Sequence, residues 1–477
     1  MELAILFIAI GGLLWLIWLG RTTGTVVHLG CVLLVGAVFG PHFFSQSVGP
    51  IPVTIDRVLL FIVFVHSCFL IAWQRRINFK FTRLDAVVVA LCLYLTASTF
   101  LTDWKFRENL PMARLLFYNY LPIAIYFIAR NADFSLKDVK VLLIGMTLFG
   151  FYLSATSIME VKGPSSLIFP SYIKSTEFVE FLGRGRGPFL NPVACGVYQI
   201  VCLVAAMMLW PHLKNNGKAI LICMAPVFMA GVFFTLTRGV WLAAAISVFL
   251  VMWIPANIKQ RSLMMAAGMM VMVVFLGFFS DKLQGFKRDK NVTAYEMSQS
   301  AGLRPLLATV ALKMAQDRPV FGCGFGQYSK HKIDYHFDSD KQPLRKVMPY
   351  MQHNVFLNYL CELGMVGVLL LLALLVGFMR SAWAAWRNPH CSLWHKQIGL
   401  VALASIVGYL VNGMFQDVSI IDTMGALFFL FGALSVNCAQ KQAIESAVEP
   451  GFEPAQAEFA QEFAQDFGTD FGEAHLA

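Results

Sequence analysis

Long apolar runs, separated by short polar connections, fill most of this chain. Thirteen of these runs approach the roughly 20 residues that an α-helix needs to cross the hydrocarbon core of a membrane. They span residues 2–20, 25–45, 54–73, 84–102, 112–130, 137–158, 190–210, 217–236, 239–254, 262–280, 353–379, 396–415 and 419–437. The pattern predicts an all-α fold, a polytopic transmembrane helical bundle of about 12–13 spans.

The first run, residues 2–20, has no basic segment before it and no persuasive small-residue cleavage site after it. We therefore expect a retained helix rather than a signal peptide that is removed. Composition agrees with a membrane protein, because 58% of the residues are hydrophobic and 14% are charged.

Basic residues gather in alternate connections between the apolar runs. They are Arg75, Arg76, Lys80, Arg83, Arg130, Lys137, Lys140, Lys214, Lys218, Lys259, Arg261, Arg380, Arg387 and Lys396. With thirteen spans these connections all fall on one side, which the positive-inside rule assigns to the cytoplasm. The N-terminus, the 159–189 loop, the turn from Leu236 to Gly239 and the 281–352 loop are then predicted to be extracytoplasmic.

Charge divides the chain into two predicted parts. Residues 1–440 form the transmembrane domain, with 281–352 as its large extracytoplasmic loop, and carry 36 basic and 20 acidic side chains. This excess suits anionic or phosphorylated lipids, whereas nucleic acid is disfavoured because the basic residues are scattered. Residues 441–477 repeat an acidic residue followed by phenylalanine, which predicts a disordered cytoplasmic tail; a helix that docks on a partner is the alternative.

Neither cysteines nor polar clusters give a strong metal signal. The ten cysteines include no Cys-x-x-Cys pair, which argues against a structural zinc site and a disulfide framework. A polar group in the long loop comprises His331, Asp334, His336, Asp338 and Asp340. We expect it to be solvated surface, with a divalent-cation site as the alternative.

Two turns that contain arginines lie at the predicted extracytoplasmic ends of spans. The segment 183–192 holds Arg184 and Arg186 among glycines and prolines and ends at Asn191, so we expect an exposed turn. Guanidinium groups bind phosphate oxygens bidentately, although both arginines also suit interfacial anchoring. Arg238 lies between two spans beside Trp241; it suits either capture of an anionic headgroup or an interfacial position.

The long loop contains an amphipathic segment. From Arg304 to Arg318, the residues Leu306, Val310 and Met314 share one face, which predicts a helix that begins at Arg304 and roofs a cavity. Arg304 would point into that cavity or lie on a solvated face. The glycine-rich stretch 321–326 then ends the helix, and it is a weak nucleotide-binding signal because no strand precedes it.

A histidine and an asparagine open the next apolar run. His353 and Asn354 follow the longest polar segment, and His353 shares one predicted helical face with Gly364 and Gly367. The pattern places a titratable base at the boundary between water and membrane, with small residues below it for close helix packing. A satisfied interfacial side chain is the alternative interpretation of His353.

Together these motifs resemble the O-antigen ligase and polymerase superfamily. The resemblance rests on Arg-Gly-Pro-Phe-x-Asn-Pro (186–192), Thr-Arg-Gly (237–239), Arg-Pro-Val-Phe-Gly-Cys-Gly-Phe-Gly (318–326), His-Asn-x-x-Leu (353–357) and Glu-Leu-Gly-x-x-Gly (362–367). It covers roughly residues 110–435, and the last two motifs are its most specific part. Thirteen predicted spans differ from the twelve usual in the ligases.

The resemblance implies a glycosyltransferase of the bacterial cytoplasmic membrane, with its site at the extracytoplasmic face. Its donor would be a glycan on a polyprenyl pyrophosphate such as undecaprenyl pyrophosphate, and transfer would use no metal or cofactor. Arg238 and Arg304 would bind the pyrophosphate beside His353, which would act as a base or a further ligand. Further substrate-binding candidates are Arg184, Arg186, Asn191 and Asn354.

The acceptor stays open within that superfamily. Ligation to a lipopolysaccharide core, polymerisation of a polysaccharide and transfer to protein share these motifs, so the partner is a glycan, a lipid or a protein. A flippase or transporter of lipid-linked glycans is the rival class. It tends to contain repeated halves, and the sequence shows no clear internal repeat.

Overall fold

The computed structural model describes residues 10–15, 17–18, 21, 24–48, 51–74, 79–106, 110–266, 294–335 and 343–441. The predicted spans 2–20 and 262–280 lie largely outside these residues. The acidic tail beyond Lys441 and the polar residues His336, Asp338 and Asp340 also lie outside them.

The described part is a helical membrane bundle with one short β-hairpin. Nine of its helical segments are long and apolar enough to cross a membrane. They are α3 (Ile55–Gln74), α4 (Arg83–Phe100), the continuous segment of α5 (Pro111–Arg114), η1 (Leu115–Tyr120) and α6 (Leu121–Asn131), α7 (Leu136–Lys162), α8 (Pro192–Leu209), α9 (Asn215–Phe234), α14 (Val355–Arg387), α15 (Leu393–Gly413) and α16 (Asp422–Gln440). Two shorter apolar helices are α2 (Thr25–Phe39) and α10 (Arg238–Trp253). The predicted all-α membrane fold is confirmed.

A turn and then the hairpin follow α2, where a longer helix is predicted. Strands β1 (Ser45–Val48) and β2 (Ile51–Thr54) pair antiparallel, with Ser45 opposite Thr54. The prediction that the helix runs to residue 45 is wrong, because α2 ends at Phe39. Pro41 lacks an N–H and disfavours helical backbone at the residue before it, which explains the extended conformation of Gly40.

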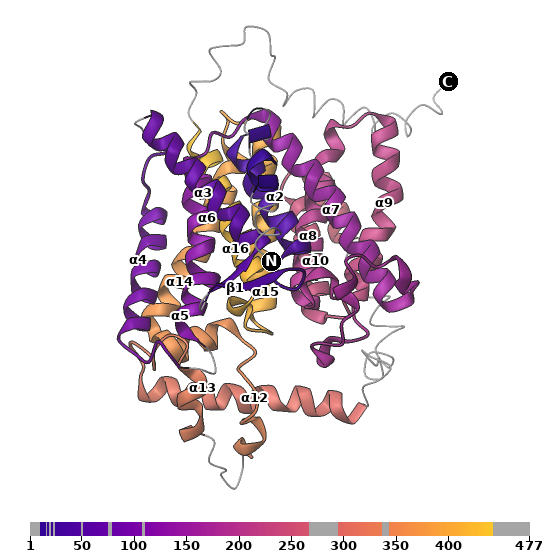
Figure 1. The fold of residues 1–477 in the computed structure, drawn as a ribbon. Helices are drawn as coiled ribbons and strands as arrows, with labels where there is room; N and C mark the ends of the chain where they lie inside the picture. The colour runs from indigo at the N-terminus through magenta and orange to yellow at the C-terminus, as the bar shows by residue number, and fades with distance from the viewer. Residues whose placement is uncertain are drawn as a thin grey trace, which may run out of the picture.

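Three helices form the centre of the bundle. In α8 and α15, 83% of the residues of the apolar segment are buried, whereas in α9 the share is 17%. Helix α16 lies beside α15 in the middle of the ribbon, and α4 and α9 lie at its edges (Figure 1). Polar residues in the central helices are therefore enclosed by protein, whereas the outer helices present apolar side chains outward.

The basic connections meet at one end of the bundle. Arg130, at the end of α6, donates from Nε to Asp85 Oδ1 at 3.0 Å and from Nη2 to the carbonyl of Lys80 at 3.0 Å. His395 Nε2 lies 3.1 Å from the carbonyl oxygen of Phe134. These contacts place the basic connections at the same end of the bundle. That this end faces the cytoplasm is inferred from the charge pattern.

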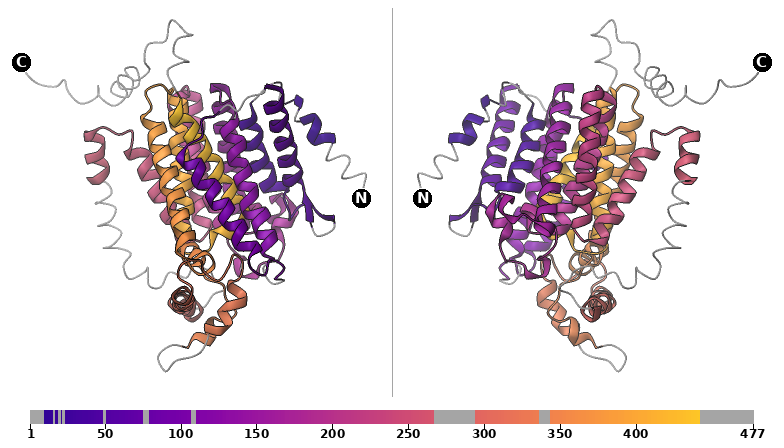
Figure 2. Two further views of the ribbon diagram at one scale, coloured as in Figure 1. Left: turned by 90° about the vertical axis from the view of Figure 1, so that its left-hand side faces the viewer. Right: turned by 90° about the vertical axis from the view of Figure 1, so that its right-hand side faces the viewer.

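The opposite end carries the longer connections. Between α7 and α8 lie the short helical turns η2 (Ser165–Leu167), η3 (Ser171–Lys174), η4 (Val179–Phe181) and η5 (Gly187–Phe189). Between α12 (Ala294–Asp317) and α14 lie α13 (Tyr328–His331), η7 (Lys332–Tyr335) and η8 (Leu344–Val347). Helix α12 runs crosswise below the ends of the spanning helices (Figure 1), and both side views keep it at that end (Figure 2). The remaining turns are η6 (Trp210–His212) and η9 (Val418–Ile420).

Candidate functional site

Three segments that are distant in sequence converge on the turn that follows α15. The guanidinium carbon of Arg304 lies 5.8 Å from the ring centroid of Phe415. Asn354 Nδ2 donates to the carbonyl of Met414 at 3.1 Å. A Cβ added at Gly239, beside Arg238, would lie 3.4 Å from Phe415 Cδ2. The structure therefore gathers the segments that bear Arg238, Arg304 and His353 around residues 414–415.

Arg238 is the first residue of α10 and its side chain is exposed. Within the described residues it makes no side-chain hydrogen bond or ion pair. Thr237 occupies the N-cap position without a side-chain hydrogen bond to the first amides of the helix. An uncapped helix N-terminus carries partial positive charge, so the guanidinium group and these amides favour an anion at the same place.

The amphipathic helix of the long loop is present, but its start differs from the prediction. Leu307, Val310 and Met314 are buried on one face of α12, whereas Arg304 is exposed on another face. The helix already extends over Ala294–Asp317, so Arg304 lies within it rather than at its beginning. Because the apolar face rests on the protein, the position of Arg304 is fixed by the packing of α12.

His353 lies just before α14 and is not part of its helical face, which corrects the prediction. Asn354 is the N-cap, and its Oδ1 accepts hydrogen bonds from the amides of Phe356 at 2.8 Å and Leu357 at 3.1 Å. The His353 side chain is accessible to solvent on part of its surface and covered by protein on the rest. Desolvation by surrounding protein, and then the charge of Arg304, lower the pKa of His353 below its ordinary value. The imidazole is therefore neutral near neutral pH.

The glycine-rich motif at residues 318–326 and the Glu-Leu-Gly-x-x-Gly motif at residues 362–367 are joined through their backbones. The amide of Cys323 donates to the carbonyl of Cys361 at 2.8 Å, and that of Gly324 to the carbonyl of Glu362 at 2.8 Å. At Gly364, with φ 63° and ψ −163°, the helical backbone of α14 is interrupted. The glycine-rich stretch therefore docks onto α14, and Gly364 permits a kink rather than the predicted close packing of helices.

A buried ion pair that was not predicted from the sequence supports this junction. Arg114 Nη1 lies 3.2 Å from Glu362 Oε1, which also accepts from the amide of Tyr328 at 3.3 Å. Nearby, burial raises the pKa of Asp417 to about 6, an effect that the charge of Arg114 opposes. Both Arg114 and Glu362 fall inside predicted apolar spans, where a charge requires a partner, and that was the signal available.

Arg184 and Arg186 are buried, which corrects the expectation that their turn exposes them. Arg184 donates to the carbonyl of Thr235 at 3.2 Å and to Thr237 Oγ1, so it holds the turn that precedes Arg238. Arg186 pairs with Glu160 at 3.5 Å. It also donates to three carbonyl oxygens, those of Ile173, Ser175 and Glu177.

Asn191 is the N-cap of α8 in the same way that Asn354 is the N-cap of α14. Its Oδ1 accepts from the amides of Val193 at 2.9 Å and Ala194 at 3.2 Å. Its side chain also lines a cavity next to the hairpin and η5. The two asparagines therefore fix where their helices begin.

The arrangement around residues 414–415 suits chemistry on a phosphorylated lipid. Two guanidinium groups and a helix N-terminus favour pyrophosphate oxygens. A neutral imidazole in the same place is able to accept a proton from a hydroxyl group.

Comparisons with known proteins point to one family. Residues 219–372 match the O-antigen ligase family, and this segment contains Arg238, Arg304 and His353. An O-antigen ligase of Salmonella typhimurium (strain LT2) is 24% identical over 259 residues, which cover 52% of this chain and 61% of the relative. The match thus spans less than two thirds of that relative. These findings confirm the predicted resemblance to the O-antigen ligase superfamily.

Proposed function

We propose that this protein, an O-antigen ligase-like membrane enzyme, is a glycosyltransferase that uses a glycan linked to polyprenyl pyrophosphate as its donor. The acceptor is a hydroxyl group, and the reaction takes place at the extracytoplasmic end of the bundle without a metal. The observation that carries the proposal is the convergence of the Arg238, Arg304 and His353 segments on residues 414–415.

The arginines act on the leaving group. During transfer, the bond between the anomeric carbon of the sugar and the pyrophosphate oxygen breaks, so negative charge grows on the pyrophosphate. Arg238 and Arg304 bind its oxygens and stabilise that charge, with the first amides of α10 beside them. Fixed positive groups of this kind need no metal to supply the same stabilisation.

His353 acts on the acceptor. The acceptor oxygen forms the new bond to the anomeric carbon, and its proton passes to the neutral imidazole. The lowered pKa of His353 keeps the base unprotonated at neutral pH, which this role requires. The alternative role, binding pyrophosphate, favours the charged imidazolium form, so the two roles differ in their dependence on pH.

The other predicted substrate-binding residues contribute by positioning. Arg184 holds Thr237, the residue before Arg238, and Asn354 anchors the start of α14 to Met414. Arg186 and Asn191 shape the turn that leads into α8. We propose that these four residues set the geometry of the site rather than bind the donor directly.

The acceptor remains one of three classes, a lipopolysaccharide core, a growing polysaccharide or a protein. A flippase for the same donor is the rival function. Transport breaks no glycosidic bond and requires no base, so the two functions predict different products.

Single alanine substitutions test this proposal. We expect Arg238→Ala and Arg304→Ala to lower glycan transfer by about 100- to 1,000-fold, the range found when one transition-state donor is removed. His353→Ala should lower it by about 100-fold or more. Arg387→Ala, which removes an exposed arginine at the far, basic end of α14, is the matched control. Normal transfer by all three folded variants would refute the assignment.

A further inference from the structure

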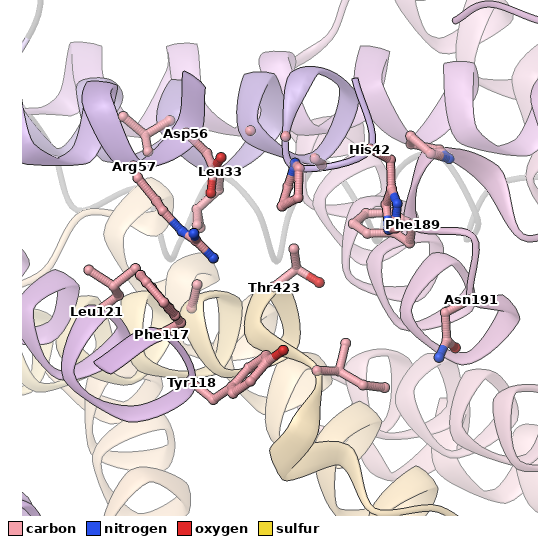
Figure 3. A pocket seen from close by; sticks show the side chains of 18 of the residues that line it. Leu33, His42, Asp56, Arg57, Phe117, Tyr118, Leu121, Phe189, Asn191 and Thr423 are labelled. Atoms are coloured by element: carbon pink, nitrogen blue, oxygen red, sulfur yellow. The ribbon is translucent and has the colours of Figure 1, made fainter. Parts of the chain in front are cut away.

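A second candidate site, a cavity, lies between the N-terminal helices and the centre of the bundle. A cavity of about 460 Å³ is bounded by α2, α3, the η1–α6 segment, η5 and the start of α16 (Figure 3). None of Arg238, Arg304 and His353 lines it, and its lining residues all lie outside the matched segment 219–372. It is therefore distinct from the site proposed for glycan transfer.

The polarity of the cavity changes along the direction of the helices. Its inner lining is aliphatic and comprises Val32, Leu33, Leu60, Leu121, Ile125 and Ala426. The end nearer the hairpin carries the polar side chains His42, Asp56, Arg57, Tyr118, Asn191 and Thr423. On α2 the lining extends from Val32 to Gly40, about 12 Å along the helix. Such a gradient, parallel to the spanning helices, matches a hydrocarbon chain with a polar headgroup.

Two adjacent residues at the polar end of the cavity, Asp56 and Arg57, indicate which kind of lipid headgroup it suits. The guanidinium carbon of Arg57 lies 3.6 Å from the ring centroid of Phe117, and Figure 3 shows the group extending into the cavity. Asp56 Oδ1 is buried and has no hydrogen-bond partner among the residues that the structure describes. An arginine suits a phosphate, and a buried carboxylate oxygen beside it favours a ligand group that donates a hydrogen bond.

We propose that this cavity binds one phospholipid of the membrane. One hydrocarbon chain occupies the aliphatic part, the phosphate lies at Arg57, and an ammonium or hydroxyl group beyond the phosphate donates to Asp56. Headgroups such as ethanolamine and glycerol supply both a phosphate and a donor. Polyprenyl phosphate supplies the chain and the phosphate without that donor, and choline lacks the donor as well.

The position of the cavity links the bound lipid to the transfer site. Ile420, Ile421 and Thr423 line the cavity, and the same connection between α15 and α16 begins with Met414 and Phe415. A lipid in the cavity thus packs against the segment around which Arg304 and Asn354 gather. We infer that it stabilises the transfer site, and this step rests on the proposed function, whereas lipid binding itself does not.

The test measures lipid retention and needs no glycan substrate. Delipidated full-length protein is incubated with phosphatidylethanolamine, phosphatidylglycerol, phosphatidylcholine or polyprenyl phosphate and examined by native mass spectrometry. We expect one tightly retained molecule of the first two lipids, with at least tenfold weaker retention of the other two. Arg57→Gln should lower retention of the favoured lipids about tenfold, whereas the control Arg318→Gln should leave it unchanged.

A second variant leaves the charged residues of the cavity unchanged and reduces the cavity's volume. Ala426→Leu narrows the aliphatic part of the cavity, so it should also lose the lipid while its thermal unfolding stays cooperative. Unchanged retention in Arg57→Gln and Ala426→Leu would overturn the site. Equal retention of phosphatidylcholine would overturn the role of Asp56, and preference for polyprenyl phosphate would identify the donor lipid as the occupant instead. Lipid retention without glycan transfer would refute only the proposed function.

Discussion

At the scale of single residues, the arginines near the predicted extracytoplasmic end fall into two groups, according to whether other residues of the protein already occupy their guanidinium groups. Arg184 and Arg186 are buried and use their guanidinium groups on carbonyl oxygens, a hydroxyl and a carboxylate of the protein. Arg238 and Arg304 are exposed, and both lie next to the turn that holds Phe415. The second group is therefore the one with donors left for a substrate.

The pH dependence of transfer tests the role of His353. As a general base, the imidazole must be neutral, so kcat/KM should fall as the pH drops through its lowered pKa. Arg304→Gln removes a positive charge that lowers this pKa, so in the residual activity the acidic limb should move to higher pH. The measurement is the pH profile of kcat/KM for wild type and variant. Activity that rises as His353 becomes protonated would contradict the base and support a pyrophosphate ligand.

The sequence identified the candidate residues but not their surroundings. Arginines at predicted span ends and the pair of His353 and Asn354 were recognisable because charges and bases are rare in apolar chains. Whether an arginine already has a partner within the protein depends on residues such as Glu160 and Thr237. They contact Arg186 and Arg184 only once the chain has folded. Local patterns do not contain that information.

At the scale of elements, the junction between α12 and α14 sets the relation between Arg304 and His353. Backbone hydrogen bonds connect the segment after α12 with Cys361, Glu362 and Met365 in α14. The predicted periodicity found both helices, because apolar residues at spacings of three and four mark helical faces. It missed the kink at Gly364, since a left-handed residue inside a helix leaves no trace in that periodicity.

A substitution at Gly364 tests the junction. A Cβ at this position meets the carbonyl of Val320, and its backbone conformation is one that other residues rarely adopt. We expect Gly364→Ala to destabilise the protein by about 1–3 kcal/mol or more and to lower transfer strongly. Thermal unfolding and a transfer assay measure the two effects.

The matched control is Gly145→Ala, in the middle of α7. A Cβ there makes an ordinary contact, 3.8 Å from Leu34 Cδ1, and alanine favours a helix over glycine. This variant should keep wild-type stability or exceed it. If both substitutions behaved alike, Gly364 would have no special role in the junction.

At the scale of the whole molecule, the fold separates a basic end from an end with the candidate site. The sequence predicted this separation through its alternating charges, and eleven of the predicted spans correspond to described helical segments. It did not predict the hairpin between α2 and α3 or the cavity beside it. Both depend on how distant segments pack, which no local pattern records.

Labelling of single cysteines tests the orientation of the bundle. Lys346, in η8, and Lys259, after α10, are exposed and lie at the predicted outer and inner ends. A membrane-impermeant maleimide should label Lys346→Cys in intact spheroplasts, and Lys259→Cys after permeabilisation alone. Wild-type protein gives the background from native cysteines. The reverse pattern would place the site on the cytoplasmic side and contradict the proposed donor geometry.

The most direct test of the account is glycan transfer by purified protein in the presence of a chelator. Protein in detergent or nanodiscs is incubated with a polyprenyl-pyrophosphate glycan and with each class of acceptor, and glycosylated product is quantified. The account predicts product with the chelator present, together with losses of about 100-fold or more in Arg304→Ala and His353→Ala. Product that requires a divalent cation, or that forms equally well in these variants, would contradict the arginine and histidine site.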